Sequence, residues 1–347
     1  MRDVIDALIR GEHPDKETLT RLLTHFSAND AAYAAEAARK TAEAVFGKRI
    51  FIRGLIEISS ICKNDCLYCG LRRSNKSAER YRLSEAEVLD CCASGYRAGF
   101  RTFVLQGGED AFFTDDILCG IVQRIKSRYP DCAVTLSMGE RSRSSYAALR
   151  QAGADRYLLR HETASPRHYE KLHPPQMSYD NRMRCLRDLK GLGFQTGCGF
   201  MVGSPFQTAD DLAEDLLFIQ KFQPHMVGIG PFIPHCDTPF RDYPSGSCDL
   251  TLFLLSLIRI TQKNVLLPAT TALGTLLEDG RERGILSGAN VIMPNLSPVE
   301  VRCKYKLYDN KLCTGDETAE QLEKLKNRIA KIGYEIVTDR GDYNNCK

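Results

Sequence analysis

The chain has 347 residues, 43% of them apolar and 26% charged, which is the composition of a globular protein with a large core. Lys and Arg total 47 against 44 for Asp and Glu, and this near-balance excludes a nucleic-acid-binding protein that relies on a strongly basic surface. The most apolar stretches, such as 252–258, are far shorter than the roughly 20 residues of a membrane helix. The N-terminal residues show no secretory signal, so we expect a cytoplasmic protein.

Helix signals come first along the chain. The first 47 residues predict helices from Asp15 and over 29–46, with Gly47 as a C-terminal cap. Strand and helix signals then alternate to about residue 300. The expected strands are 49–59, 102–108, 133–139, 156–162, 195–203, 226–234, 265–274 and 290–296. Ser84 with Glu87, Thr114 and Thr208 mark helix starts, and 317–333 predicts a charged amphipathic helix.

Eight short apolar strands separated by helices favour a complete (βα)8 TIM-type barrel over a doubly wound sheet. We expect an N-terminal helical extension (1–47), a barrel (48–300) and a C-terminal extension that closes the barrel (301–347). In such barrels the active site lies at the C-terminal ends of the strands, and the residues that follow the predicted strands are polar.

Fourteen cysteines without a secretion signal predict reduced thiols. Five of them lie in or beside apolar segments and are interpreted as small buried hydrophobes: Cys91, Cys92, Cys119, Cys132 and Cys185. Cys62, Cys66 and Cys69 instead form a C-x3-C-x2-C motif in the polar loop after the first strand. Three thiolates suit an iron–sulfur cluster with one open iron, whereas a closed zinc site requires four ligands; zinc or no metal is the alternative.

The motif, with an aromatic residue before its third cysteine and a Gly-Gly-Glu turn after the second strand, resembles the signature of radical S-adenosylmethionine (radical-SAM) enzymes. The resemblance spans about residues 48–300. It implies a radical-SAM barrel in which Cys62, Cys66 and Cys69 hold a 4Fe-4S cluster. The open iron then binds S-adenosylmethionine (SAM), which is cleaved to methionine and a 5′-deoxyadenosyl radical.

The same resemblance implies the residues that bind SAM. They are Tyr68 near the adenine, Gly107, Gly108 and Glu109 beside the methionine amine, Ser137 at the end of the third strand, Glu162 for the ammonium and Arg182 for the carboxylate. An arginine on a helix is often a solvated surface charge, and this is the alternative for Arg182.

Within this class, the stretches 66–76, 153–164, 226–239, 268–275 and 288–298 resemble the maturases of FeFe hydrogenase. This resemblance implies an enzyme that helps to assemble the diiron subcluster of the hydrogenase active site. Its substrate is then a small organometallic or amino-acid-like anion. The implied partners are other hydrogenase maturases and a reductant protein, with no nucleic acid and no membrane.

Inward-facing charges predict where the substrate binds. Arg160 shares its strand face with Glu162, and these two residues are the expected catalytic pair. Because a buried guanidinium requires an anionic partner, Arg53, Arg160, Thr270 and Thr271 predict an anion pocket opposite the cluster. The structural alternative for Arg53 is an ion pair with Glu57, four residues along the same strand face.

The remaining candidates favour ordinary structural roles. His161 and His235 are interpreted as packing residues, because no second His or carboxylate stands at ligand spacing. The C-terminal cysteine set is incomplete for a second cluster, so Cys303, Cys313 and Cys346 are interpreted as unpaired thiols. The alternative functions are a methylornithine synthase-like or biotin synthase-like radical-SAM enzyme, or a non-catalytic iron–sulfur scaffold.

Overall fold

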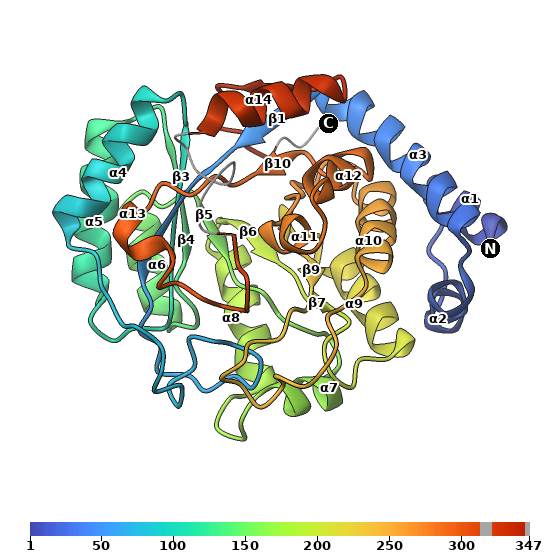
Figure 1. Ribbon diagram of the computed structural model, residues 1–347, viewed down its shortest axis with the longest axis horizontal. Helices are drawn as coiled ribbons and strands as arrows, with labels where there is room; N and C mark the ends of the chain where they lie inside the picture. The colour runs from blue at the N-terminus through green and yellow to red at the C-terminus, as the bar shows by residue number, and fades with distance from the viewer. Residues whose placement is uncertain (313–320, 344–347) are drawn as a thin grey trace.

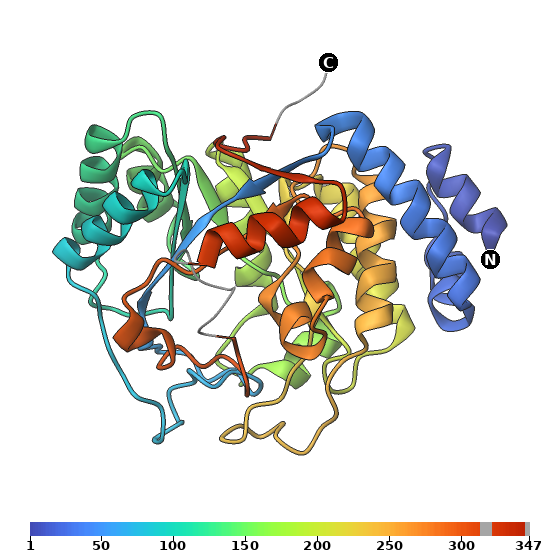
Figure 2. The ribbon, with the colours of Figure 1, turned by 45° about the horizontal axis from the view of Figure 1, so that its top comes forward.

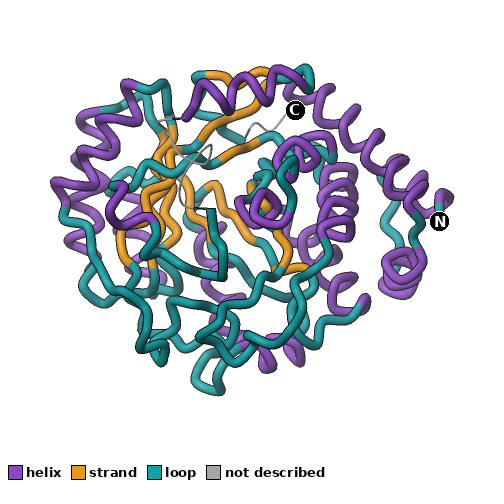
Figure 3. Tube along the Cα trace, in the orientation of Figure 1, coloured by secondary structure: helices purple, strands orange, loops and turns teal. Residues whose placement is uncertain are grey.

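A ring of parallel strands lies at the centre of the molecule, with helices around it (Figures 1 and 3). The computed structural model describes residues 1–312 and 321–343. The strands are β1 (Arg49–Ile52), β2 (Gly54–Ser59), β3 (Thr102–Gly107), β4 (Ala133–Ser137), β5 (Arg156–Leu158), β6 (Gln195–Cys198), β7 (Met201–Val202), β8 (Met226–Val227), β9 (Gly230–Pro231), β10 (Val291–Ile292) and β11 (Glu335–Val337).

The parallel ladders close the ring. A six-stranded sheet has the order β2-β3-β4-β5-β6-β8. Met226 of β8 then bridges Leu266, and Pro268 bridges Val291 of β10. Strand β10 pairs with β1, and β1 and β2 form one barrel strand interrupted at Arg53. The sheet thereby returns to its first strand, and the predicted (βα)8 barrel is confirmed.

The helices form the outer layer. They are α1 (Arg2–Ile9), α2 (Lys16–His25), α3 (Ala28–Phe46), α4 (Glu85–Arg97), α5 (Asp115–Arg128), α6 (Arg143–Gln151), α7 (Pro166–Leu172), α8 (Tyr179–Gly191), α9 (Ala209–Phe222), α10 (Cys248–Thr261), α11 (Thr271–Leu276), α12 (Gly280–Leu286), α13 (Val299–Arg302) and α14 (Leu322–Lys331). Among the described residues no helix combines the length and apolarity that a bilayer crossing requires.

The predicted helix caps are present. Ser84 and Glu87 form a capping box at the start of α4, and the side chains of Thr114 and Thr208 accept hydrogen bonds from the first turns of α5 and α9. Gly47 ends α3 with a positive φ of 62°, a conformation that costs glycine little.

The prediction for the seventh strand is wrong at its C-terminal end. Residues 265–274 were expected to be extended, but the chain pairs only at Leu266 and Pro268, and α11 begins at Thr271. Thr270 is the N-cap residue of α11, but its side chain makes no capping hydrogen bond, so packing rather than capping accounts for the helix. Leu273 then buries its side chain from the helix, which offsets the loss of strand pairing.

The two chain ends pack on the barrel from outside. Helix α3 packs on α10 and α2 on α9, while α14 crosses the barrel beside β1 (Figure 2). Strand β11, which the sequence did not predict, pairs in parallel with β1. The predicted helix 317–333 is observed from Leu322, since residues 313–320 lie outside the described part of the chain.

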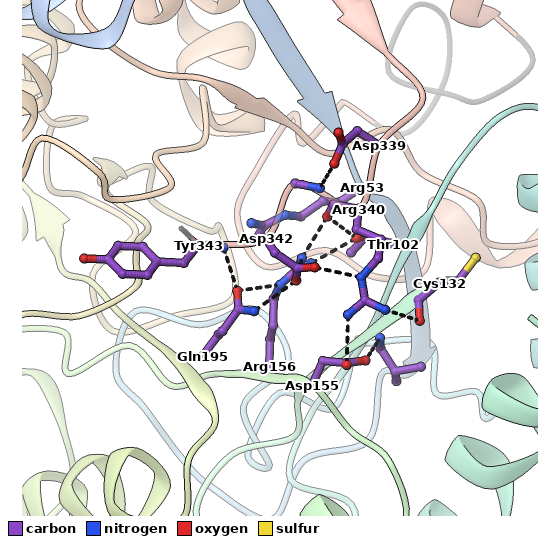
Figure 4. Close-up of polar contacts among 12 residues, drawn as sticks. Arg53, Thr102, Cys132, Asp155, Arg156, Gln195, Asp339, Arg340, Asp342 and Tyr343 are labelled. Carbon is purple, nitrogen blue, oxygen red and sulfur yellow. Dashed lines mark hydrogen bonds and ion pairs between the residues drawn. The ribbon is translucent and has the colours of Figure 1, made fainter. Parts of the chain in front are cut away.

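The segment after β11 crosses the N-terminal end of the barrel (Figure 4). Fully buried Arg156 donates hydrogen bonds to the Asp342 carboxylate (2.6 Å) and to the Arg340 carbonyl (2.7 Å). Arg340 pairs in turn with Asp155 (3.0 Å). Although burial alone would raise it, these arginines lower the pKa of Asp342 to about 2. This network covers the end of the barrel opposite the expected active site.

Candidate active site

The three motif cysteines lie in the long loop that follows β2, at the C-terminal end of the barrel. The loop is held by its own polar groups. Asp65 accepts two hydrogen bonds from the Arg72 guanidinium (2.9 and 2.8 Å), and two more from Ser74. Arg80 donates to four backbone carbonyls along the loop. These hydrogen bonds hold the loop through groups of the protein itself.

Burial keeps the three thiols protonated in the protein alone. Desolvation raises the pKa of Cys62 and raises that of Cys66 well above its ordinary value. Desolvation, with the nearby Cys62, raises the pKa of Cys69 to about 12. A metal centre that supplies positive charge would stabilise these groups as thiolates. The donor set therefore fits a thiolate-bound iron–sulfur cluster.

The Gly107-Gly108-Glu109 turn contacts the cysteine loop directly. The Glu109 N–H donates to Cys62 Sγ (3.4 Å), and a Cβ on Gly108 would overlap the Ile61 carbonyl and the Cys62 side chain. Glycine is thus required at position 108 by close approach. The Glu109 carboxylate itself turns toward Lys63 (3.2 Å) and the Glu140 N–H (3.0 Å).

Glu162 occupies a strained backbone position. Its φ is +67°, a left-handed conformation that a glutamate adopts at a cost of about 1–3 kcal/mol. The adjacent His161 fixes the turn, because its Nε2 lies 3.1 Å from the buried Asp215 carboxylate and its Nδ1 accepts the Gly199 N–H. Burial lowers the pKa of His161 to about 3, so this ring is neutral. The interpretation of His161 as a packing residue agrees with these contacts.

Arg182 is buried, so the alternative of a solvated surface charge does not hold. Its guanidinium pairs with Glu140 and donates to the Arg160 carbonyl (2.6 Å). The Arg160 side chain lies 3.3 Å from the Glu162 carboxylate. The structure therefore places Arg182 beside the predicted pair of Arg160 and Glu162, and adds Glu140, which the sequence gave no reason to choose.

Tyr68 lies between Cys66 and Cys69 of the motif in sequence. Its hydroxyl lies 3.2 Å from His173 Nε2, and its ring packs on apolar side chains at the ends of β7 and β9. Burial raises the pKa of Tyr68 well above its ordinary value, and the negative charge of the nearby Glu162 acts in the same direction. Ser137, at the end of β4, is half-buried at the same rim.

The four residues of the predicted anion pocket have different neighbours in the structure. Thr270 caps α11 at the rim and leaves its buried Oγ1 without a hydrogen bond; Thr271 follows it. Arg53 lies instead near Arg340 and Asp342 toward the barrel base (Figure 4), and its Nη1 contacts Met226 Sδ (3.0 Å). Arg53 lies toward the base because it comes before β2 in the chain, whereas the rim is formed by residues that follow the strands.

The alternative for Arg53, an ion pair with Glu57, is wrong. The buried Glu57 carboxylate binds Lys311 Nζ (2.7 Å) and Asn295 Nδ2 (2.9 Å). Lys311 belongs to residues 303–312, which lie across the mouth of the barrel and which we call the strap. No local sequence signal indicates this pairing, because 254 residues separate its partners.

One cysteine interpretation is wrong. Cys303 is disulfide-bonded in the structure, whereas the sequence suggested an unpaired thiol. Pairing depends on which segments the fold brings together, and spacing along the chain does not reveal it. Cys313 and Cys346 lie outside the described residues.

Comparisons with known proteins agree with this geometry. The family model of the Radical SAM superfamily matches residues 56–219. The chain is 43% identical over 344 residues to the FeFe hydrogenase maturase subunit HydE of Thermotoga maritima, covering 98% of this chain and 97% of that protein. It is 27% identical over 335 residues to 3-methylornithine synthase of Methanosarcina acetivorans, covering 95% and 92%.

Solved structures show the same fold. Methylornithine synthase superposes with a TM-score of 0.83 at 26% identity, over 96% of this chain and 97% of that chain. The FeFe-hydrogenase maturase HydG from Carboxydothermus hydrogenoformans superposes with a TM-score of 0.78 at 20% identity, over 96% and 78%. The barrel and its cysteine loop thus define a radical-SAM enzyme, a class that uses a 4Fe-4S cluster and SAM. Within that class, the chain belongs to the family of the FeFe hydrogenase maturase subunit HydE.

Proposed function

We propose that this enzyme acts in maturation of FeFe hydrogenase, in the assembly of the active-site diiron subcluster. The observation that carries the proposal is the 43% identity to HydE, which extends over 98% of the chain and so includes the barrel mouth as well as the cysteine loop. Partner hydrogenase maturases, a reductant protein and a cytoplasmic location are parts of the same proposal.

Cys62, Cys66 and Cys69 hold the 4Fe-4S cluster in this proposal. When bound, the cluster supplies the electron that cleaves SAM to methionine and a 5′-deoxyadenosyl radical. The closeness of Gly108 to Cys62 supports a SAM site beside the Gly107-Gly108-Glu109 turn. Glu162 binds the SAM ammonium, Arg182 orients its carboxylate, and Tyr68 and Ser137 complete the site.

The substrate in this proposal is a small anion, organometallic or amino-acid-like, held at the barrel mouth. Among the buried polar atoms of the described residues, Arg160 Nε and the Thr270 hydroxyl have no hydrogen-bond partner, and Arg160 Nη2 has only the ion pair with Glu162 (3.3 Å). Buried polar groups are normally hydrogen-bonded, so these atoms are suited to a ligand. Thr271 adjoins them. Arg53, toward the base, faces the barrel interior and is proposed to line its lower part.

Two alternatives have their own support and their own difficulty. A methylornithine synthase is favoured by the TM-score of 0.83, but it would need a free carboxylate for a substrate ammonium, and the buried Glu57 carboxylate is paired with Lys311. A biotin synthase requires a second cluster inside the barrel. Cys132 precedes β4 and Cys198 ends β6, so these two cysteines lie at opposite ends of the strands and cannot share one cluster.

Maturation of a hydrogenase tests the proposal. The reconstituted enzyme, added to a system that contains apo-hydrogenase and the other maturases but lacks the HydE component, should restore hydrogen evolution. A scaffold without radical chemistry would not form 5′-deoxyadenosine on reduction with SAM. Formation of 5′-deoxyadenosine without any hydrogen evolution, together with conversion of an amino-acid substrate, would favour the methylornithine synthase alternative instead.

A further inference from the structure

A second group of metal-binding side chains lies at the mouth of the barrel, apart from the cysteine motif. His235 Nδ1, Cys236 Sγ and an Asp309 carboxylate oxygen all lie within 4.8 Å of one another. The Nδ1–Sγ distance is 3.8 Å, and Nδ1 lies 4.0 Å from Asp309 Oδ1. In this order, the three groups supply nitrogen, sulfur and oxygen.

The fold holds these groups together through the backbone. His235 and Cys236 follow β9, whereas Asp309 comes from the strap. The Asp309 N–H donates to the Pro234 carbonyl (3.0 Å), and the Cys236 N–H donates to Asp309 Oδ2 (2.9 Å). These two hydrogen bonds fix the aspartate beside the cysteine and leave Oδ1 directed at His235.

The cluster loop fixes the histidine from its other side. The buried His235 ring packs on Gly70, and a Cβ at that position would overlap the ring. The Gly70 N–H donates to the Leu307 carbonyl of the strap (2.9 Å). The residue that follows Cys69 is thus in direct contact with one of the three groups.

The Nδ1 atom of His235 is oriented as an acceptor toward the chain that follows it. The Asp237 N–H donates to His235 Nδ1 (3.1 Å), so the Nδ1 lone pair takes part in a hydrogen bond to the backbone. A metal ion would become the partner of this lone pair in place of the backbone N–H.

From this geometry we infer a binding site for a divalent transition-metal ion of borderline softness, zinc or ferrous iron, ligated by His235, Cys236 and Asp309. Imidazole and thiolate ligands suit these ions, whereas calcium and magnesium prefer oxygen alone. Zinc bonds of about 2.0 Å to N or O and about 2.3 Å to S place ligand atoms roughly 3.3–3.7 Å apart. Relative to that geometry, the Nδ1–Sγ distance of 3.8 Å must shorten by about 0.3 Å and the Nδ1–Oδ1 distance of 4.0 Å by about 0.7 Å, which rotation of the Asp309 side chain would supply.

Three protein ligands leave one coordination position open. The open position faces a cavity of about 120 Å³ whose lining includes the same three residues with Lys304 and Lys306. Lys304 is paired with Glu79 (3.6 Å), and Lys306 adds positive charge to the wall. A water molecule or a small anion therefore suits the fourth position, as in open metal sites. Because Asp309 lies on the strap, binding also joins the strap to the loop after β9.

Zinc binding to the cluster-loaded enzyme tests the inference. The holoenzyme, with its iron content verified, is titrated anaerobically with zinc against a chromophoric chelator. Wild type should bind one zinc per chain. Cys236→Ala removes an exposed side chain, and Asp309→Asn keeps the hydrogen bond to Cys236. Each variant should weaken zinc affinity by more than about 10–100-fold, which is the loss typical of removing a residue that only supports a metal ligand. Asp242→Ala, an exposed aspartate of the same loop, should bind as wild type does.

X-ray absorption at the zinc edge identifies the ligands. The bound zinc should have one sulfur neighbour at about 2.3 Å and otherwise nitrogen or oxygen. Three sulfur neighbours would place the zinc on the motif cysteines and overturn the inference. Equal affinity in wild type and Cys236→Ala would overturn it as well, as would binding that depends on Cys236 but not on Asp309.

Discussion

The ammonium group of Lys311 lies 2.7 Å from the Glu57 carboxylate, and both side chains are buried. Glu57 belongs to the first barrel strand and Lys311 to the strap, so this ion pair joins the two ends of the barrel sequence. The strap also hydrogen-bonds the cluster loop through Leu307 and the loop after β9 through Asp309. The pair therefore helps to hold the C-terminal segment over the site.

Lys311→Met should destabilise the protein by about 3–5 kcal/mol at neutral pH, because it leaves a buried carboxylate uncompensated. Burial already raises the pKa of Glu57, and loss of Lys311, which lowers it, will raise it further. A carboxyl group with a raised pKa in the folded state destabilises that state progressively as the pH rises above its unfolded pKa. The stability deficit should therefore be larger at pH 8 than at pH 5 in denaturant unfolding.

The double variant Glu57→Gln with Lys311→Met is the matched control. It removes both charges, so most of the lost stability should return and the added pH dependence should disappear. A single variant as stable as wild type at pH 8 would show that the pair makes no net contribution.

Cys66→Ser should prevent assembly of a complete cluster. Anaerobic reconstitution of wild type should load about four irons per chain, as expected for a cubane on three thiolates. The variant loses one of the three ligands. Cys119→Ser, a half-buried cysteine on α5, is the control and should load as wild type does. Full iron content in Cys66→Ser would contradict the assignment.

Glu162→Gln should weaken SAM binding by about 2–5 kcal/mol while cluster content is retained, because a charge directed at the ligand ammonium is lost. Glu162→Gly separates charge from backbone strain. At φ +67° glycine is unstrained, so this variant should fold at least as stably as wild type and still bind SAM poorly. Equilibrium SAM binding to the reconstituted proteins measures both, and unchanged affinity would remove Glu162 from the site.

Asp215→Ala should cost about 1–3 kcal/mol of stability, since it leaves the His161 imidazole and the Ala164 N–H without their buried acceptor. Because those contacts fix the Glu162 turn, SAM affinity should also fall. Asp215→Asn keeps one carbonyl oxygen and should lose less of both. Denaturant unfolding and SAM titration give the two quantities, and normal SAM affinity in Asp215→Ala would show that the turn holds without this contact.

Local chemistry made much of the fold predictable from sequence. The capping residues Ser84, Thr114 and Thr208 set helix starts through hydrogen bonds within one turn, and the structure places all three as expected. The prediction for the C-terminal end of the seventh strand was wrong because threonine is common both in strands and at helix N-caps. Only tertiary packing decides between the two at Thr270. The division of the chain at residues 47 and 300 stays a prediction.

Long-range contacts were beyond sequence reasoning. The motif cysteines were recognisable because their ligands lie within one loop. Lys311 with Glu57, Arg182 with Glu140, and His235 with Asp309 join segments far apart in the chain, so no spacing reveals them. For Arg53, strand alternation predicted correctly that the side chain faces the barrel interior. It did not predict how far along the barrel axis the side chain lies.

Arg160→Lys should impair turnover while cluster content and SAM binding remain nearly normal. Arg160 Nη2 forms an ion pair with the Glu162 carboxylate (3.3 Å), and its Nε is buried without a hydrogen-bond partner. Lysine keeps the charge, and so the attraction to Glu162, but it loses the planar fork that binds an anion through two parallel N–H groups. Loss of one charge-assisted hydrogen bond of about 1.5–3 kcal/mol corresponds to a roughly 10–100-fold fall in kcat/KM.

Thr270→Val, which removes the unpartnered hydroxyl at the rim, should lower kcat/KM in the same direction with little change in stability. Hydrogenase maturation rate gives the readout for both variants, with 5′-deoxyadenosine formation in the absence of substrate as the measure of an intact SAM site. If Arg160→Lys and Thr270→Val both mature hydrogenase at the wild-type rate, the anion does not bind at this rim. Binding would then have to use the deeper Arg53, and Arg53→Met should be the variant that fails.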